Sequence, residues 1–207
     1  MFITLEGGEG TGKSTQAKLL KQYLENKGIE VILTREPGGS AGAEEIRQLL
    51  VTGSANKWET DTEILLMYAA RSDHFQKLIR PALQNNKWVI CDRFADSTLA
   101  YQGYGKGFDL NFLNILYQKI IGETQPDLTF IFDIDVEAGL QRANTRMQRV
   151  NSNENRFESM DLKFHQLVRN GFLHIAAQNP DRCFVINAGL PIHNVHTQVV
   201  EKLANFF

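Results

Sequence analysis

Hydrophobic residues along the chain fall into short continuous runs, separated by longer segments in which apolar positions repeat at helical spacing. The continuous runs are rich in β-branched, aromatic and leucine side chains. Such runs are typical of strands buried on both faces, as in a parallel sheet. We therefore expect strands over residues 2–6, 31–35, 88–92, 128–134 and 183–187.

Helices are expected between these strands. Ala17, Leu20 and Leu24 recur at helical spacing, and Gly28 is a suitable stop for that helix. Pro81 should break or kink a helix, or start a new one. The further helices are predicted over residues 43–51, 61–86, 96–102, 110–121, 136–147, 159–178 and 192–206.

Alternating strands and helices predict an α/β fold, with a parallel sheet covered by helices on both faces. Ligands of such sheets bind beyond the carboxyl ends of the strands. Every predicted strand ends in polar or charged residues, so a site is expected at this edge. The residues concerned are Glu6, Arg35, Glu36, Asp92, Arg93, Asp133 and Asn187.

Composition narrows the class of protein. The 207 residues are enough for one well-cored domain, and the net charge of −2 argues against a nucleic-acid polymer or an acidic membrane as partner. The sequence contains no apolar run long enough to span a bilayer and no recognisable signal peptide. Cys91 and Cys183 lie in apolar runs and are expected to be buried free thiols. These features predict a cytoplasmic protein of one domain, residues 1–207.

A phosphate-binding loop follows the first predicted strand. The segment Gly7-x-x-x-x-Gly12-Lys13-Ser14 matches the Walker A pattern, which a chain of this length matches by chance about one time in a hundred. Its backbone N–H groups and the following helix N-terminus favour phosphate. Lys13 should reach the β- and γ-phosphates of ATP, and Ser14 should ligate Mg²⁺. The expected ATP-binding residues are Gly7, Gly8, Glu9, Gly10, Thr11, Gly12, Lys13, Ser14 and Thr15.

The loop alone leaves several classes of nucleotide-binding protein open. GTPases, mechanical ATPases, regulatory switches and small-molecule kinases all carry it. The sequence has no Asn-Lys-x-Asp segment for guanine, and the chain is small for a mechanical ATPase. The choice therefore depends on the residues at the other strand ends.

Those residues make the chain resemble the thymidylate kinase family, which phosphorylates dTMP to dTDP with ATP. The resemblance rests on "EGGEGTGKST", "TREPGG", "AAR", "DRF", "AYQG", "PDLTFIFD" and the arginine-rich stretch from 139 to 158, in that order. It covers nearly the whole chain. It implies a five-stranded parallel sheet, a mobile lid near residues 142–158, Mg²⁺ as cofactor, ATP and dTMP as substrates, and a homodimer. A kinase of another nucleotide or of a deoxynucleoside is the alternative.

The resemblance also explains why Glu9 stands in an anion-binding loop. It implies that this carboxylate turns toward the sugar 3′-hydroxyl of dTMP, and that Arg93 binds the acceptor phosphate. Two strand-end carboxylates, Asp92 and Asp133, are candidates for the Mg²⁺ site, and the resemblance favours Asp92. The expected catalytic set is Lys13, Asp92, Arg93 and Arg146.

Gly10 stands where some members of the family carry a phosphate-stabilising arginine. Because that cation is missing from the loop, the lid is expected to supply one. The candidates are Arg142, Arg146, Arg149 and Arg156. Arg146 is the first choice for catalysis, and Arg142 is expected near the adenine of ATP.

The resemblance implies a binding pocket for the pyrimidine. Arg71 corresponds to a donor to thymine O4, and Tyr101 to a ring under the sugar. Met67 replaces the usual stacking phenylalanine with a polarisable thioether. The remaining residues expected to bind dTMP are Glu36, Arg47, Thr98 and Gln102.

Overall fold

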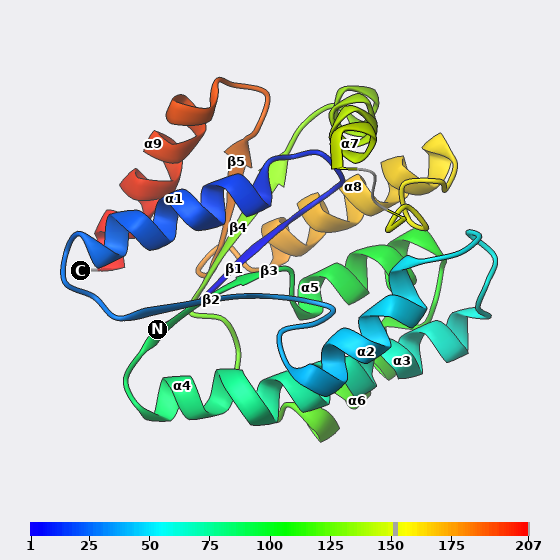
Figure 1. Ribbon diagram of the computed structural model, residues 1–207, viewed down its shortest axis with the longest axis horizontal. Coiled ribbons are helices and arrows are strands. Elements are labelled where there is room, and N and C mark those ends of the chain that lie inside the picture. The colour runs from blue at the N-terminus through cyan, green and yellow to red at the C-terminus, as the bar shows by residue number, and fades with distance from the viewer. Residues whose placement is uncertain (151–152, 207) are drawn as a thin grey trace.

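The computed structural model describes residues 1–150 and 153–206, and the side chains of residues 149, 150 and 205 lie outside that description. Within the described residues, five strands form one parallel sheet in the order β2-β3-β1-β4-β5 (Figure 1). This confirms the predicted α/β fold, and each strand lies within one residue of its expected bounds. The strands are β1 (Phe2–Gly7), β2 (Val31–Arg35), β3 (Trp88–Asp92), β4 (Leu128–Asp133) and β5 (Cys183–Asn187).

Helices connect the strands and cover both faces of the sheet (Figure 1). The α-helices are α1 (Lys13–Glu25), α2 (Ala41–Val51), α3 (Thr60–His74), α4 (Arg80–Gln84), α5 (Ala95–Thr98), α6 (Leu110–Ile120), α7 (Val136–Val150), α8 (Leu162–Gln178) and α9 (Ile192–Leu203). Two π-helical segments, η1 (Phe75–Ile79) and η2 (Leu99–Gly105), and a 3₁₀ turn, η3 (Ala204–Phe206), complete the helical structure of the described residues.

The π-helical segments are the main difference from the sequence expectation. The helix predicted over 61–86 consists of α3, η1 and α4, and the one predicted over 96–102 consists of α5 and η2. Pro81 has no N–H, and its ring would clash with the carbonyl four residues earlier in a regular helix. The wider turn of η1 lies just before it and lets the chain continue into α4.

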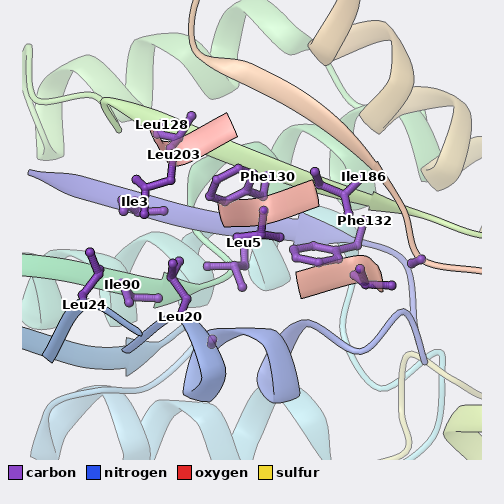
Figure 2. Packing of buried hydrophobic residues seen from close by; sticks show 14 of the residues in the cluster. Ile3, Leu5, Leu20, Leu24, Ile90, Leu128, Phe130, Phe132, Ile186 and Leu203 are labelled. Atoms are coloured by element: carbon purple, nitrogen blue, oxygen red, sulfur yellow. The ribbon is translucent and has the colours of Figure 1, made fainter. Parts of the chain in front are cut away.

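One face of the sheet packs against α1 and α9. Ile3 and Leu5 of β1 join a buried cluster with Leu20 and Leu24 of α1 and Leu203 of α9 (Figure 2). Alternate residues of a strand point to opposite faces, so the neighbouring positions serve the other side. This cluster holds the helix that follows the phosphate loop against the centre of the sheet.

The opposite face packs against η1 and α8. Phe2 of β1 lies with Phe75 of η1 in one buried cluster, and Ile131 of β4 lies with Phe172 of α8 in another. Cys91 and Cys183 are buried free thiols, as predicted. In the part of the chain that the structure describes, no helix combines the length and apolar character needed to cross a membrane.

Candidate functional site

The central position of β1 places the phosphate loop beside the polar end of β3. β1 pairs with β3 on one side and β4 on the other, and Leu5 lies opposite Asp92 in the register. A cavity of about 440 Å³ opens at this edge. It extends from the phosphate loop, through Arg93, to Arg71 and Gln102. Of the strand-end residues expected at this edge, Arg35, Glu36, Asp92 and Arg93 line the cavity, whereas Glu6, Asp133 and Asn187 do not.

The phosphate loop encloses the Lys13 ammonium. The Lys13 Nζ atom donates to the carbonyl oxygens of Gly8 at 2.7 Å and Gly7 at 3.1 Å, and also contacts Thr11 Oγ1 at 3.1 Å. Burial lowers the pKa of Lys13 to about 8, and the Arg93 charge acts in the same direction. The cation is thus held inside the loop, close to the N-terminus of α1.

Ser14 and Asp92 meet at the mouth of the loop. The Ser14 hydroxyl donates to Asp92 Oδ2 at 2.5 Å, and both residues line the cavity. Asp133 is occupied elsewhere, because Arg169 binds both of its carboxylate oxygens, at 2.7 and 2.9 Å. Of the two candidate carboxylates, Asp92 is therefore the one that faces the cavity.

Arg93 connects the phosphate loop to the side chains of Glu9 and Tyr101. Its backbone adopts a left-handed conformation with φ of 71°, which is uncommon for a residue with a side chain. Its guanidinium donates to Gly7 O at 2.9 Å, Ser97 Oγ at 3.1 Å, Glu9 Oε1 at 3.0 Å and the Tyr101 hydroxyl at 3.0 Å. These four bonds fix the cation at the centre of the cavity wall.

Glu6 supports the loop that carries Arg93. This buried carboxyl at the end of β1 accepts from the Phe94 N–H at 2.7 Å and from the Ser97 hydroxyl at 2.5 Å. Burial, followed by the charge of Asp96, raises the pKa of Glu6 to about 7. Glu6 was expected only as a polar strand end, and its contacts give it a supporting role behind Arg93.

Glu9 turns away from the loop interior and toward Arg93 and Tyr101. The Tyr101 hydroxyl donates to Glu9 Oε1 at 2.6 Å, the same oxygen that Arg93 binds. Burial raises the pKa of Glu9, but Arg93, Lys13 and the Tyr101 hydrogen bond outweigh it and bring the pKa down to about 2. The carboxylate therefore stays charged on the side of the loop that faces Arg93 and Tyr101.

Arg71 lies at the far end of the cavity. Its Nε donates to Glu36 Oε2 at 2.8 Å, and its Nη2 donates to Thr98 Oγ1 at 3.0 Å and Phe94 O at 3.1 Å. Its remaining nitrogen, Nη1, is buried and has no hydrogen-bond partner among the described residues. Burial raises the pKa of Glu36, but the Arg71 charge and the His74 hydrogen bond reverse this and lower it. A donor without a partner thus remains beside the cavity.

Other residues expected to bind dTMP line the same space. Met67 and Gln102 are among the lining residues, and Arg47 lies where the cavity meets the segment after α7. Arg47 donates to Pro37 O at 2.7 Å and pairs with Glu154 at 2.7 Å. All the acceptor-side residues predicted from the sequence are therefore brought together around one cavity.

The predicted lid arginines have different surroundings. Arg142 Nη1 donates to Ala188 O at 3.0 Å, and Arg146 lies 3.7 Å from Glu158 with 57% of its side chain exposed. Arg149 carries a side chain outside the described part of the structure.

Arg156 corrects the expectation that it is a lid cation facing ATP. It is buried, donates to the carbonyl oxygens of Leu50, Ser54 and Ala55, and pairs with Glu63. Its charge is neutralised inside the protein, away from the phosphate loop. The last turn of α2 has carbonyls without helical partners, and Arg156 satisfies one of them.

Sequence reasoning missed several residues of the cavity wall. Phe157 and Glu158 line it and are not among the residues predicted from the sequence. Burial, followed by the charge of Glu9, raises the pKa of Glu158 to about 7. The sequence signal that could have identified Glu158 is its position as a carboxylate inside an arginine-rich stretch. The other lining residues outside the predicted set are Pro37, Val51, Phe94, Ser97, Ala143, Met147 and Glu154.

Comparisons with known proteins identify the family of this chain. A family model described as thymidylate kinase matches residues 5–199. The thymidylate kinase of Caulobacter vibrioides is 52% identical over 187 residues, which cover 90% of this chain and 88% of that protein. The thymidylate kinase of Magnetococcus marinus is 47% identical over 206 residues, which cover 100% of this chain and 96% of that protein.

A solved structure shows the same architecture. The crystal structure of thymidylate kinase from Ehrlichia chaffeensis superposes with a TM-score of 0.79 at 41% sequence identity, covering 99% of this chain and 98% of that one. The family match spans most of the sequence, and the relatives match over nearly their whole length. The chain therefore belongs to the thymidylate kinase family.

Proposed function

We propose how the residues of this chain carry out the reaction of its family, the ATP-dependent phosphorylation of dTMP to dTDP. The observation that carries the proposal is the single cavity that joins Lys13 of the phosphate loop to Arg71. Arg93 lies between them and binds both the loop and Glu9. A donor phosphate at one end and an acceptor base at the other would bring the two phosphates together at Arg93.

ATP occupies the loop end in this proposal. The backbone N–H groups of residues 7–15 surround the phosphates, and Lys13 exchanges its loop carbonyl contacts for phosphate oxygens. Arg142 donates a hydrogen bond to Ala188 O, just after β5, and in this proposal its side of α7 covers the adenine. Segment 142–158 acts as the lid of one domain formed by residues 1–207.

Mg²⁺ is the proposed cofactor, and the residues present suit it. Ser14 and Asp92 present a hydroxyl and a carboxylate oxygen to the same point of the cavity, and hard oxygen ligands are those that Mg²⁺ prefers. No group of three or more His, Cys, Asp or Glu able to hold a metal occurs among the described residues. When bound, the ion would neutralise charge on the β- and γ-phosphates.

dTMP occupies the other end. Arg93 binds its phosphate, Glu9 accepts from the sugar 3′-hydroxyl, and the Tyr101 ring lies under the sugar. The partnerless Nη1 of Arg71 supplies a donor for O4 of the base. Met67, Thr98 and Gln102 enclose the pyrimidine, and Glu36 and Arg47 hold the surrounding wall.

Phosphoryl transfer needs alignment more than acid–base help. The second pKa of a phosphate monoester is about 6, so the dTMP phosphate is largely a dianion at neutral pH. One of its oxygens attacks the γ-phosphorus, the bond to the bridging oxygen breaks, and ADP leaves with that electron pair. Lys13, Arg93 and Arg146 neutralise the charge that develops on the transferred group.

We also propose that the enzyme is a homodimer. Large apolar side chains are exposed on three helices, of which α3 contacts the other two: Leu49 of α2, Leu65 of α3, and Phe112 and Ile115 of α6. Between 43% and 60% of each side chain is exposed. A second copy of the chain would cover these side chains, and sedimentation equilibrium measures whether it does.

The test of the proposed mechanism is coupled ADP release, measured with each of dTMP, dUMP, AMP, CMP and thymidine as acceptor. dTMP should be preferred, and ADP release should depend on the acceptor. The Lys13→Ala variant should lose turnover while keeping its melting temperature. Lys18 is an exposed lysine of the same helix, and the Lys18→Ala variant should retain turnover. A folded Lys13→Ala protein with normal turnover would refute the role of the loop.

A further inference from the structure

The side-chain amide of Gln102 has one end satisfied and one end free. Its Nε2 donates to Glu63 Oε1 at 2.8 Å. Its Oε1 is buried and has no hydrogen-bond partner among the described residues, although Gln102 lines the cavity. A buried acceptor without a donor is costly in a folded protein, so this oxygen is suited to a ligand that brings an N–H group.

Glu63 determines which end of that amide is free. It lies in the first turn of α3, is fully buried, and pairs with Lys106 at 2.8 Å and with Arg156. Lys106 and Arg156 both contact its oxygens, and a carboxylate can only accept hydrogen bonds. The Gln102 NH₂ must therefore face Glu63, and the carbonyl is left without a partner.

The free atoms of Gln102 and Arg71 form a pattern. Arg71 Nη1 is a buried donor without a partner in the described residues, and Gln102 Oε1 is the corresponding acceptor. Thymine and uracil present an O4 acceptor beside an N3–H donor, which complements this pair. Cytosine presents an amino donor beside an unprotonated N3, which reverses both positions.

We propose that Glu63 is a positioning residue that fixes the Gln102 carbonyl as the acceptor for N3–H, and that it thereby sets the preference for thymine over cytosine. This inference rests on the proposed placement of dTMP. Glu63 does not touch the nucleotide. It acts by preventing the amide from turning over to offer its NH₂ group to cytosine N3.

The decisive measurement is the ratio of kcat/KM for dTMP to that for dCMP. In Glu63→Gln, the new amide can donate as well as accept, so Gln102 can turn over. The ratio should fall at least tenfold, mainly through a higher KM for dTMP, while the KM for ATP stays within twofold. dUMP shares N3–H and O4 with dTMP, so its kcat/KM relative to that of dCMP should fall by the same factor. Calorimetric binding of dTMP and dCMP without ATP should show the same change.

Two controls separate positioning from stability. Asp61→Asn removes an exposed charge from the same turn of α3 and should leave the ratio within twofold. Lys106→Met removes one cation from Glu63 but keeps the carboxylate against Gln102. It should lower the melting temperature and preserve the ratio. If Glu63→Gln does not fold, the Glu63→Gln/Lys106→Met pair removes both charges and allows the same comparison.

A second variant tests the acceptor itself. Gln102→Met should reduce the ratio by the same factor as Glu63→Gln, and the double variant should add little, because both act on one amide. A ratio within twofold of wild type in either single variant, or equal losses for dTMP and dCMP, would overturn the assignment of Glu63. Failure of the wild-type enzyme to phosphorylate dTMP would instead overturn the proposed function.

Discussion

Gly10 of the phosphate loop and Gly139 of α7 meet backbone to backbone. A Cβ atom on Gly10 would lie 1.9 Å from the Gly139 carbonyl oxygen, and one on Gly139 would lie 2.6 Å from the carbonyl oxygen of Glu9. The helix that leads into the proposed lid therefore starts directly on the loop. A side chain at position 10, such as the arginine some members of the family carry, has no room in this arrangement. Glycine at position 10 therefore leaves the loop without an arginine and also allows α7 to approach it closely.

We expect Gly10→Ala to displace α7 and to reduce turnover at least tenfold. The comparison is Gly28→Ala. Both glycines have positive φ, 65° and 77°, so both substitutions place an L-residue in the left-handed region at a cost of about 1–2 kcal/mol. Nothing lies within 4 Å of a Cβ at Gly28, and that variant should lose stability but keep its turnover. Steady-state kinetics with melting curves measure both. Equal effects of the two substitutions on turnover would show that the contact with α7 is unimportant.

We expect Glu9→Ala to weaken dTMP binding more than ATP binding. The carboxylate binds Arg93 and Tyr101 on the acceptor side, and losing a charge-assisted hydrogen bond costs about 1.5–3 kcal/mol. Because its pKa is about 2, Glu9 stays charged from pH 4 upward, and its contribution should not titrate in that range. Separate calorimetric titrations of dTMP and of ATP test this, with the exposed Glu25→Ala as control. Equal weakening of both ligands would contradict the orientation of Glu9.

The sequence predicts the sheet well because its strands are buried on both faces. Each strand is a continuous apolar run bounded by polar residues, and a slip of one position would bring a polar side chain into the core. The π-helical turns η1 and η2 are not predicted, since one extra residue in a turn barely changes the apolar periodicity of a long helix.

The candidate site likewise has one part that the sequence predicts and one part that it does not. Its loop and strand-end residues belong to local motifs, and the fold gathers them at one edge. Arg156 could not be separated from Arg146 by its neighbours in sequence, because both lie in a polar, charged stretch. The partners that bury Arg156 are about 100 residues away, in the turn after α2 and at Glu63. Burial decided by such distant contacts leaves no local signal.

We expect Glu158 to make the free enzyme less stable as the pH rises. Burial and the nearby charge of Glu9 raise its pKa from 4.5 to about 7. Between these values the folded protein binds more protons than the unfolded chain, so the free energy of unfolding falls with rising pH across this window. Below pH 4.5 the carboxyl is protonated in both states and has no effect.

Glu158→Gln should remove that loss. Its stability relative to wild type should grow from pH 4.5 to pH 7 and then stay constant, as measured by urea unfolding at four pH values. Glu154→Gln is the matched control with the opposite sign. The hydrogen bond from Arg47 lowers the pKa of Glu154, so this variant should be less stable than wild type at neutral pH, and the difference should disappear in acid. Parallel pH profiles for wild type and Glu158→Gln would contradict the assignment.

Arg146 and Arg156 should differ sharply when each is replaced by alanine. Arg146 lines the cavity and is more than half exposed, and its only ion-pair partner among the described residues is Glu158, so it is free to move onto a phosphoryl group. An arginine supplied in this way can contribute about 10³–10⁵ in rate. We expect Arg146→Ala to lower kcat far more than it raises the KM for dTMP, because the interaction is made mainly in the transition state.

Arg156→Ala should instead lower the melting temperature, since it removes one of the two cations that pair with the buried Glu63 and takes a donor from three backbone carbonyls. Its kcat should be much less affected wherever the protein is folded. Steady-state kinetics and melting curves on both variants decide between the two roles. If Arg146→Ala keeps turnover within about threefold, which is under 1 kcal/mol, the lid supplies no essential cation at this position. Lys13, Arg93 and Mg²⁺ would then have to neutralise the transferred group, because Arg156 is already engaged in the interior.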